Sequence, residues 1–264
     1  MKNSLFPALI LAFAAQGAQA QSLDGVARLD VIPGWQTGDG THMAGLRVTL
    51  APGWKTYWRA PGDAGIPPQF SYRGSDNIAA VQYHWPVPDV FHQSGMRSIG
   101  YHDSVVLPVE ITPAQSGAPI HLSGTIDIGV CEEICIPMQF TFDAALPADG
   151  GRDGAIVAAL LDQPVPAAAA GIGSARCTIT PTERGMQISA TIAAPQGNPA
   201  VVIEAGDPYI WVSEPDVTRG AGTLTATSEF VHVNQGSFAI DRSAIRMTLL
   251  GNGQAIDIQG CIAG

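Results

Sequence analysis

Two cysteines, Cys131 and Cys135, are the residues of this chain whose type and spacing best suit chemistry. They are natural partners for each other, because the other two cysteines lie far along the chain. A disulfide across so short a loop removes little entropy from the unfolded chain and is a weak structural staple. A redox pair needs proximity and access, and little else from its loop. The spacing alone leaves a structural bridge and thiol–disulfide exchange equally open.

The neighbours of the pair limit the chemistry it can perform. Glu132 and Glu133 place negative charge beside the thiols, which disfavours thiolate. This pattern favours a relay that waits to be attacked over a broad-range oxidant. Two thiolates also suit a soft metal such as Cu(I) or Zn, and Met43, Met96 and Met138 lie in the same half of the chain. Because two cysteines alone do not complete a zinc site, we predict no metal ligands and no cofactor.

The other two cysteines, Cys177 and Cys261, bracket the C-terminal part of the chain. A bridge that closes a loop of about 85 residues contributes roughly 4–5 kcal/mol in the chain-entropy model. We therefore predict a structural disulfide here, with a second redox pair as the less favoured alternative.

The first twenty residues have the pattern of a cleaved signal peptide. Lys2 supplies a positive start, residues 5–15 are apolar, and residues 18–20 (AQA) form a small-x-small cleavage site. No later stretch approaches the roughly 18–20 apolar residues of a membrane helix. We expect a mature chain without a membrane span, exported to the periplasm, where disulfides persist.

The charge balance argues against nucleic acid as a partner. The full chain has a formal net charge of −10, and removing Lys2 leaves 12 Lys and Arg against 23 Asp and Glu, a net charge of −11. Binding to nucleic acid depends on Lys and Arg that neutralise phosphates, so an acidic chain is a poor candidate.

Short alternating apolar segments, separated by turns rich in the 30 glycines and 20 prolines, predict an all-β chain. We expect two immunoglobulin-like β-sandwich domains joined by an Ala/Gly/Pro-rich linker. The predicted parts are a signal peptide at 1–20, a first domain at 21–146, a linker at 147–174 and a second domain at 175–264.

Three local predictions accompany this division. A brief helix is expected at residues 155–162, within the linker. Residues 85–101 contain two prolines and two glycines without clear alternation, and are predicted to form a long, functional surface loop. Trp54, Tyr57 and Trp58 are expected to pack in the core between the sheets.

Four stretches, in order, resemble the N-terminal periplasmic domain of the DsbD family of thiol:disulfide interchange proteins, in particular its copper-sensitivity-suppressor branch. They are residues 53–65 (GWKTYWRAPGDAG), 85–88 (WPVP), 100–101 with 105–109 (GY, VVLPV) and 130–137 (VCEEICIP). Together they extend the resemblance over roughly residues 25–146, about half of the mature chain.

The resemblance implies an immunoglobulin-like domain whose pair, Cys131 and Cys135, carries electrons. In the family the pair receives them from a membrane-embedded thiol domain, by way of a thioredoxin-like domain, and hands them to periplasmic substrates. A mobile cap loop shields the pair. By position, the cap here consists of His92, Gln93, Ser94, Gly95, Met96 and Arg97. Met96 takes the place of the family's aromatic cap residue.

The sequence stops at Gly264 without the family's membrane helices or terminal thioredoxin-like domain. We therefore expect a stand-alone oxidoreductase of the protein-disulfide reductase type. Its electron donor would be a membrane thiol reductase, and its acceptors periplasmic thioredoxin-fold or other disulfide-bearing proteins. The alternative is a non-catalytic binding module, for copper or a protein partner, in which both disulfides are structural.

Overall fold

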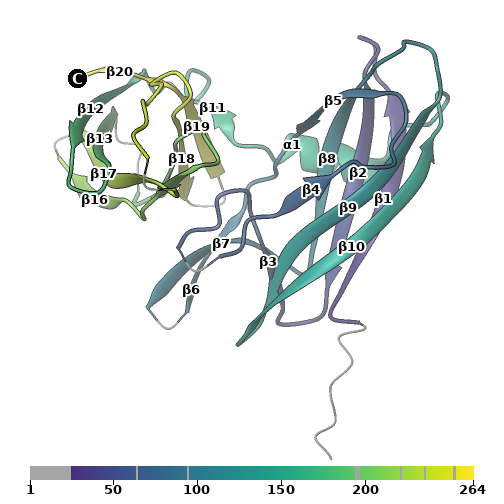
Figure 1. Cartoon of the computed structure of the whole chain (residues 1–264), viewed down its shortest axis with the longest axis horizontal. Helices are drawn as coiled ribbons and strands as arrows, with labels where there is room; N and C mark the ends of the chain where they lie inside the picture. Colours follow the sequence, from purple (N-terminus) through teal and green to yellow (C-terminus); the bar gives the residue numbers. More distant parts are fainter. Residues whose placement is uncertain are drawn as a thin grey trace, which may run out of the picture.

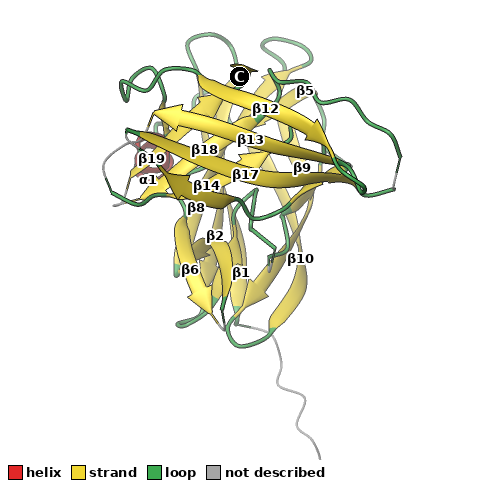
Figure 2. Cartoon of the chain, turned by 90° about the vertical axis from the view of Figure 1, so that its left-hand side faces the viewer, coloured by secondary structure: helices red, strands yellow, loops and turns green. Residues whose placement is uncertain are grey.

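The computed structural model describes residues 25–63, 65–93, 95–193, 197–220, 222–234, 236–251 and 254–264. The predicted signal peptide at 1–20 and Ser94 of the predicted cap lie outside these ranges. Within them the chain forms two β-sandwich domains that lie side by side (Figure 1), and the strands of both are visible in the perpendicular view of Figure 2. The expected fold class, two immunoglobulin-like sandwiches, is confirmed.

The first domain consists of two sheets. The smaller sheet has, in spatial order, β1 (Ala27–Gln36), β2 (His42–Leu50), β8 (Ser104–Pro113) and β5 (Ile78–Tyr83). The larger sheet has β10 (Cys135–Leu146), β9 (Ile120–Cys131), β3 (Lys55–Tyr57), β7 (Met96–His102) and β6 (Asp89–Gln93), and β4 (Gln69–Ser71) also pairs with β9. The core between them is apolar because alternate residues of each strand point inward, among them Leu46, Val109 and Leu122.

The second domain repeats this plan with its own core. One sheet has β11 (Val165–Pro166), β19 (Gln254–Gln259), β18 (Arg246–Gly251) and β14 (Ala200–Glu204). The other has β15 (Ile210–Val212), β17 (Thr223–His232), β13 (Met186–Ala193), β12 (Ala175–Pro181) and β20 (Cys261–Ala263), and β16 (Asp216–Arg219) also pairs with β17. Phe230, Ile188 and Met247 are fully buried between the two sheets.

The prediction of a long loop at residues 85–101 is wrong, since β6 and β7 form an antiparallel hairpin there. Its alternation is hidden because one face of β7 carries the small, buried residues Ser98 and Gly100, which lie against β3. A Cβ added to Gly100 would collide with the carbonyl oxygen of Thr56 on β3. The opposite face of the hairpin carries Val90 and Ile99, which are packed in an apolar cluster.

The segment between the domains contains a helix that packs on the first domain and a strand that pairs with the second. Helix α1 (Gly154–Leu161) begins at Asp153, whose carboxylate accepts hydrogen bonds from the first main-chain N–H groups, as helix N-caps do. Ile156 of this helix is buried against the first domain beside Trp35 and Met43. The helix lies where the sequence predicts one, and β11 then pairs with β19 of the second domain.

The domains meet over an apolar cluster closed by an ion pair. Trp58 and Ile99 of the first domain pack with Val202 and other residues of the second. At the edge of this cluster, Arg59 forms two hydrogen bonds of 3.0 Å with the carboxylate of Glu204. The guanidinium of Arg59 also stacks on the Trp58 ring, 3.8 Å from its centroid. The first domain therefore contacts the second through the face of its larger sheet that carries Val90 and Ile99, together with Trp58 after β3.

We expect Arg59→Ala to lower the free energy of unfolding by about 2–3 kcal/mol, since it leaves a partly buried carboxylate without its partner. The measurement is urea denaturation followed by tryptophan fluorescence. Arg28→Ala is the matched control, because Arg28 pairs with Asp30 on an exposed surface and such pairs contribute about 0–1 kcal/mol. Equal shifts of the two midpoints would show that the Arg59 ion pair does not stabilise the interface.

Candidate active site

Cys131 and Cys135 form a disulfide at the end of the β9–β10 hairpin. Cys131 is the last residue of β9 and Cys135 the first of β10, and the two face each other in the antiparallel register with Cα atoms 4.1 Å apart. Residues 132–134 make the tight connection. The hairpin thus brings the two sulfurs together on one face of the larger sheet.

The two sulfurs differ sharply in access. Cys131 is 1% exposed, whereas Cys135 is exposed and follows Ile134, whose side chain is 69% exposed. A protein partner that approaches the hairpin from solvent therefore meets Cys135 first. This asymmetry does not follow from the spacing and is contributed by the fold.

Tyr57 lies directly against the disulfide. Its hydroxyl oxygen is 2.9 Å from Cys131 Sγ and 3.0 Å from Cys135 Sγ. Disulfide sulfurs carry no hydrogen, so the Tyr57 hydroxyl, with its single hydrogen, is the donor in this contact. Burial raises the pKa of Tyr57, which keeps the hydroxyl protonated at neutral pH. The sequence predicted only core packing for this residue, and its contact with both sulfurs was missed.

The ring of Tyr57 has room there because residue 129 is glycine. A Cβ added to Gly129 would approach Tyr57 Cε2 and Ile66 Cβ to 2.9 Å each. Thr56, the residue before Tyr57, donates its hydroxyl to the Gly129 carbonyl at 2.9 Å. These contacts hold β3 against the end of β9 and so fix the hydroxyl over the sulfurs.

Lys55 lies beside the pair on the same face of the sheet. It is opposite Cys131 in the register of β3 and β9, and opposed residues of antiparallel strands share a face. Its ammonium is 3.0 Å from Gln93 Oε1 and 3.3 Å from Ser98 Oγ, and lies 5.1 Å from the centroid of the Phe91 ring. Burial lowers the pKa of Lys55 from its ordinary value.

The residues predicted to form the cap lie at the tip of the β6–β7 hairpin. His92 and Gln93 end β6, Met96 and Arg97 begin β7, and Gly95 is in the turn between them. Gln93 contacts the cysteine hairpin directly, since its side-chain amide donates to the Glu132 carbonyl at 3.2 Å.

The other predicted cap residues are placed differently. The side chain of Met96 is 58% exposed, and Arg97 turns toward the second domain, where it donates to the Val201 carbonyl and pairs with Glu214. The aromatic residue of this hairpin nearest to the predicted position is Phe91, beneath the Lys55 ammonium, and the sequence analysis did not single it out. In the sequence, Phe91 is the aromatic residue directly before the predicted cap, and this position could have indicated it.

The second disulfide, Cys177–Cys261, closes 84 residues of sequence and lies within the second domain. It joins the neighbouring strands β12 and β20, and Cys177 is fully buried. Cys261 is only partly exposed, so this bridge is less accessible to a partner than Cys135 is.

Among the residues that the structure describes, no group of three His, Cys, Asp or Glu side chains is placed to hold a metal ion. Over the same residues, no helix is long and apolar enough to cross a membrane.

An immunoglobulin-like sandwich with an accessible disulfide on its surface has the features of a thiol–disulfide exchange domain. Residues 22–147 match the family model described as thiol:disulfide interchange protein DsbD, N-terminal. Residues 22–147 therefore form a DsbD N-terminal-like domain. The family supports a thiol–disulfide exchange module in the periplasm.

Two solved structures are similar to this chain. The N-terminal periplasmic domain of ScsB from Proteus mirabilis has a TM-score of 0.63 and 21% identity, over 90% of this chain and 93% of that chain. This likeness extends over both domains and shows the shared fold. The reduced DsbD N-terminal domain of Neisseria meningitidis covers 49% of this chain and 90% of its own, at 18% identity and a TM-score of 0.28. No curated protein matches the sequence.

Proposed function

We propose that the chain relays electrons in the periplasm, from a membrane thiol reductase to disulfide-bearing proteins, through Cys131 and Cys135. The observation that carries the proposal is the unequal access of the two sulfurs in one disulfide, with Cys135 exposed and Cys131 buried. A pair built this way accepts attack at one sulfur and keeps the other for resolution.

The first half-reaction reduces the pair. A thiolate of the donor attacks Cys135 Sγ, the bond to Cys131 breaks, and Cys131 leaves as a thiolate. The second thiolate of the donor then attacks the donor sulfur of the mixed disulfide and releases Cys135. Two electrons have moved, the donor is left as a disulfide, and the two cysteines take up protons from water.

The second half-reaction returns the pair to its starting state. The Cys135 thiolate attacks one sulfur of the acceptor disulfide, and the other acceptor sulfur leaves as a thiolate. The Cys131 thiolate attacks Cys135 Sγ, which restores the Cys131–Cys135 bond and releases the second acceptor sulfur. The acceptor is reduced by two electrons, and each half-reaction passes through one mixed disulfide.

Tyr57 is the residue best placed to assist both half-reactions. Its hydroxyl donates toward the sulfur that leaves as a thiolate, and hydrogen bonds to charged acceptors are stronger than those to neutral ones. Lys55, opposite Cys131 in the register, places positive charge on the same face as that thiolate.

Tyr57→Phe is expected to slow reduction of the pair by dithiothreitol about tenfold, because the leaving thiolate loses a hydrogen-bond donor. The rate is measured by stopped-flow fluorescence at pH 7. Tyr72→Phe serves as the control, since the Tyr72 hydroxyl bonds to Tyr83 within the first domain and does not touch the disulfide. An unchanged rate in Tyr57→Phe would remove this residue from the mechanism.

The exchange function itself is tested by mixing the reduced chain with an excess of an oxidised thioredoxin of high reduction potential, so that electron transfer from the chain is favourable, and trapping free thiols over time. The expected result is loss of the Cys131 and Cys135 thiols in step with gain of thiols on the thioredoxin. A chain that stays reduced while the thioredoxin stays oxidised would contradict the proposal.

A further inference from the structure

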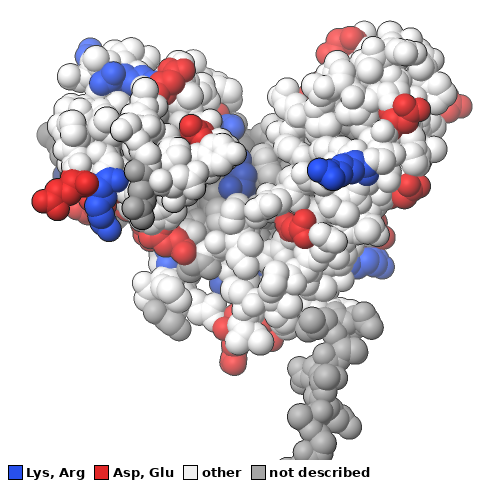
Figure 3. Space-filling model, in the orientation of Figure 1, with Lys and Arg blue, Asp and Glu red and all other residues white. Residues whose placement is uncertain are grey.

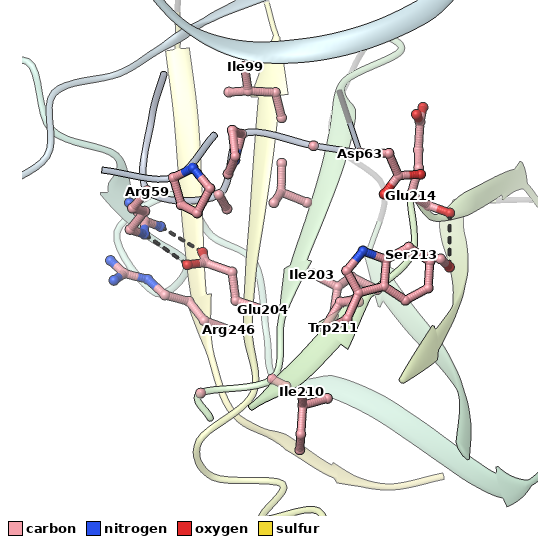
Figure 4. A pocket seen from close by; sticks show the side chains of 18 of the residues that line it. Arg59, Asp63, Ile99, Ile203, Glu204, Ile210, Trp211, Ser213, Glu214 and Arg246 are labelled. Atoms are coloured by element: carbon pink, nitrogen blue, oxygen red, sulfur yellow. Dashed lines mark hydrogen bonds and ion pairs between the residues drawn. The ribbon is translucent and has the colours of Figure 1, made fainter. Parts of the chain in front are cut away.

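A cleft of about 690 Å³ lies between the two domains, next to the segment that supports the disulfide. Figure 3 shows the two lobes of the molecule, and Figure 4 shows the cleft from close by, with Arg59 and Glu204 on one side and Trp211 and Glu214 on the other. Its walls include the end strands β14 and β15 of the second domain, and residues 59–63, 65 and 67 of the first.

One wall offers an open strand edge. Ser213 donates its N–H to Glu229, and Val233 donates to Tyr209, which fixes the alternation of hydrogen bonds between β15 and β17. In this register the N–H and C=O of Val212 point away from β17, to the free side of the sheet. Among the described residues, no hydrogen bond reaches the main chain of Val212 from that side. Such an edge is a template for an added strand.

The cleft is apolar with a residual negative charge. Trp211, 46% exposed, and Val233 present apolar surface to solvent. The three lining arginines are already engaged by carboxylates, in the pairs Arg59–Glu204, Arg97–Glu214 and Arg246–Asp257. Asp63 and Asp207 also line the cleft, and no described cation pairs with either.

The cleft and the candidate active site share one supporting segment of the first domain. Pro61, Gly62 and Pro67 line the cleft, while Ile66 of the same segment lies against Gly129 and Tyr57. Gly129 is two residues before Cys131 on β9. One short segment therefore has the disulfide on one side and the cleft on the other.

We propose that the cleft binds an extended, basic segment of the redox partner, which adds to β15 as a further strand while the cysteine of that partner reaches Cys135. The inference rests on the proposed exchange function and names the recognition element of the partner. Main-chain hydrogen bonds to Val212 supply affinity, and lysine or arginine side chains meet Asp63 and Asp207.

The probe is a fluorescein-labelled heptapeptide of alternating lysine, valine and threonine, titrated with the mature oxidised chain and followed by fluorescence anisotropy. A second peptide has glutamate at every lysine position. The lysine peptide is expected to bind at least about tenfold more tightly than the glutamate peptide. Equal binding of the two peptides, or no binding of either, would overturn the proposal.

Val212→Pro removes the outward N–H and is expected to weaken binding of the lysine peptide about tenfold. Val217→Pro is the matched control. Val217 is also partly buried against the core of the second domain, and the bond from Gly220 to Thr223 places its N–H on the outer side of β16, away from the cleft. Equal effects of the two variants would contradict strand addition at β15.

A charge variant keeps the test intact if Val212→Pro does not fold. Asp63→Lys should weaken the lysine peptide about tenfold, and Asp149→Lys, the same change in an exposed turn, should not. Equal effects of these two would likewise overturn the assignment. Sedimentation of the chain alone tests whether a second copy of the chain occupies the cleft instead. A dimer that Val212→Pro dissociates would show that it does, and would overturn the proposal.

Two readouts separate this inference from the proposed function. Peptide binding is measured with the Cys131→Ser, Cys135→Ser double variant, where exchange is impossible and binding is expected to persist. Reduction by dithiothreitol is measured on the unmodified chain and does not need the cleft. Lost peptide binding with normal reduction overturns the inference alone, and normal binding with a disulfide that resists reduction overturns the proposed function alone.

Discussion

Cys131→Ser is expected to form a mixed disulfide rapidly with oxidised glutathione, whereas Cys135→Ser should react at least about tenfold more slowly, because access controls exchange. Both variants should lose all electron transfer to an oxidised acceptor, since a single thiol cannot resolve its own mixed disulfide. The physical reason for the asymmetry is the burial of Cys131 beneath Tyr57, while Cys135 stands in solvent. The adducts are counted by intact-protein mass spectrometry over time.

The matched control for this experiment is Cys177→Ser with Cys261→Ser, which leaves the β9–β10 hairpin untouched. This variant is expected to exchange at the normal rate, provided that it is assayed where it remains folded. Equal adduct rates for Cys131→Ser and Cys135→Ser would contradict the assignment of Cys135 as the attacked sulfur. Residual turnover in either single variant would contradict the whole dithiol mechanism.

The same Cys177→Ser, Cys261→Ser variant should lose roughly 4–5 kcal/mol of stability in the second domain, since the bridge closes a long loop in the unfolded state. The bridge also ties β12 to β20, the C-terminal strand of the described chain. Guanidinium denaturation, followed by near-ultraviolet circular dichroism, reports the change as a lower midpoint.

Removing the Cys131–Cys135 bridge provides the comparison. Its loop is only four residues in sequence, so the chain-entropy model assigns it a much smaller contribution. We therefore expect the Cys131→Ser, Cys135→Ser variant to have a denaturation midpoint close to that of the unmodified chain. If the short bridge proved as stabilising as the long one, a structural role for the short bridge would be favoured over exchange.

The strands that carry the site were predicted more reliably than their ends. The short alternating apolar segments predict a β domain here, but they do not show that β9 continues to Cys131 and that β10 starts at Cys135. Gly129 and Pro137 indicate breaks when each is considered alone. In the fold, Gly129 makes room for Tyr57, and Pro137 is tolerated because β10 is the end strand of its sheet.

Other features required the three-dimensional arrangement. The β6–β7 hairpin was hidden because its inner residues, such as Ile99, pack on the second domain, which local sequence does not reveal. The contact of Tyr57 with both sulfurs depends on the pairing of β3 with β9, separated by more than sixty residues along the chain. The signal in the sequence was the combination of an aromatic strand with a glycine two residues before the first cysteine.

The reduction potential of each disulfide decides whether the Cys131–Cys135 pair can relay electrons. The mature chain is equilibrated in thiol buffers of known potential, and free thiols are trapped and assigned by mass spectrometry. We predict that Cys131–Cys135 is reduced in the range of periplasmic reductants, while Cys177–Cys261 stays oxidised until the buffer is more reducing than about −300 mV, as structural bridges do. Equal resistance of both pairs to reduction would contradict the relay and make the chain a binding protein held by two structural disulfides.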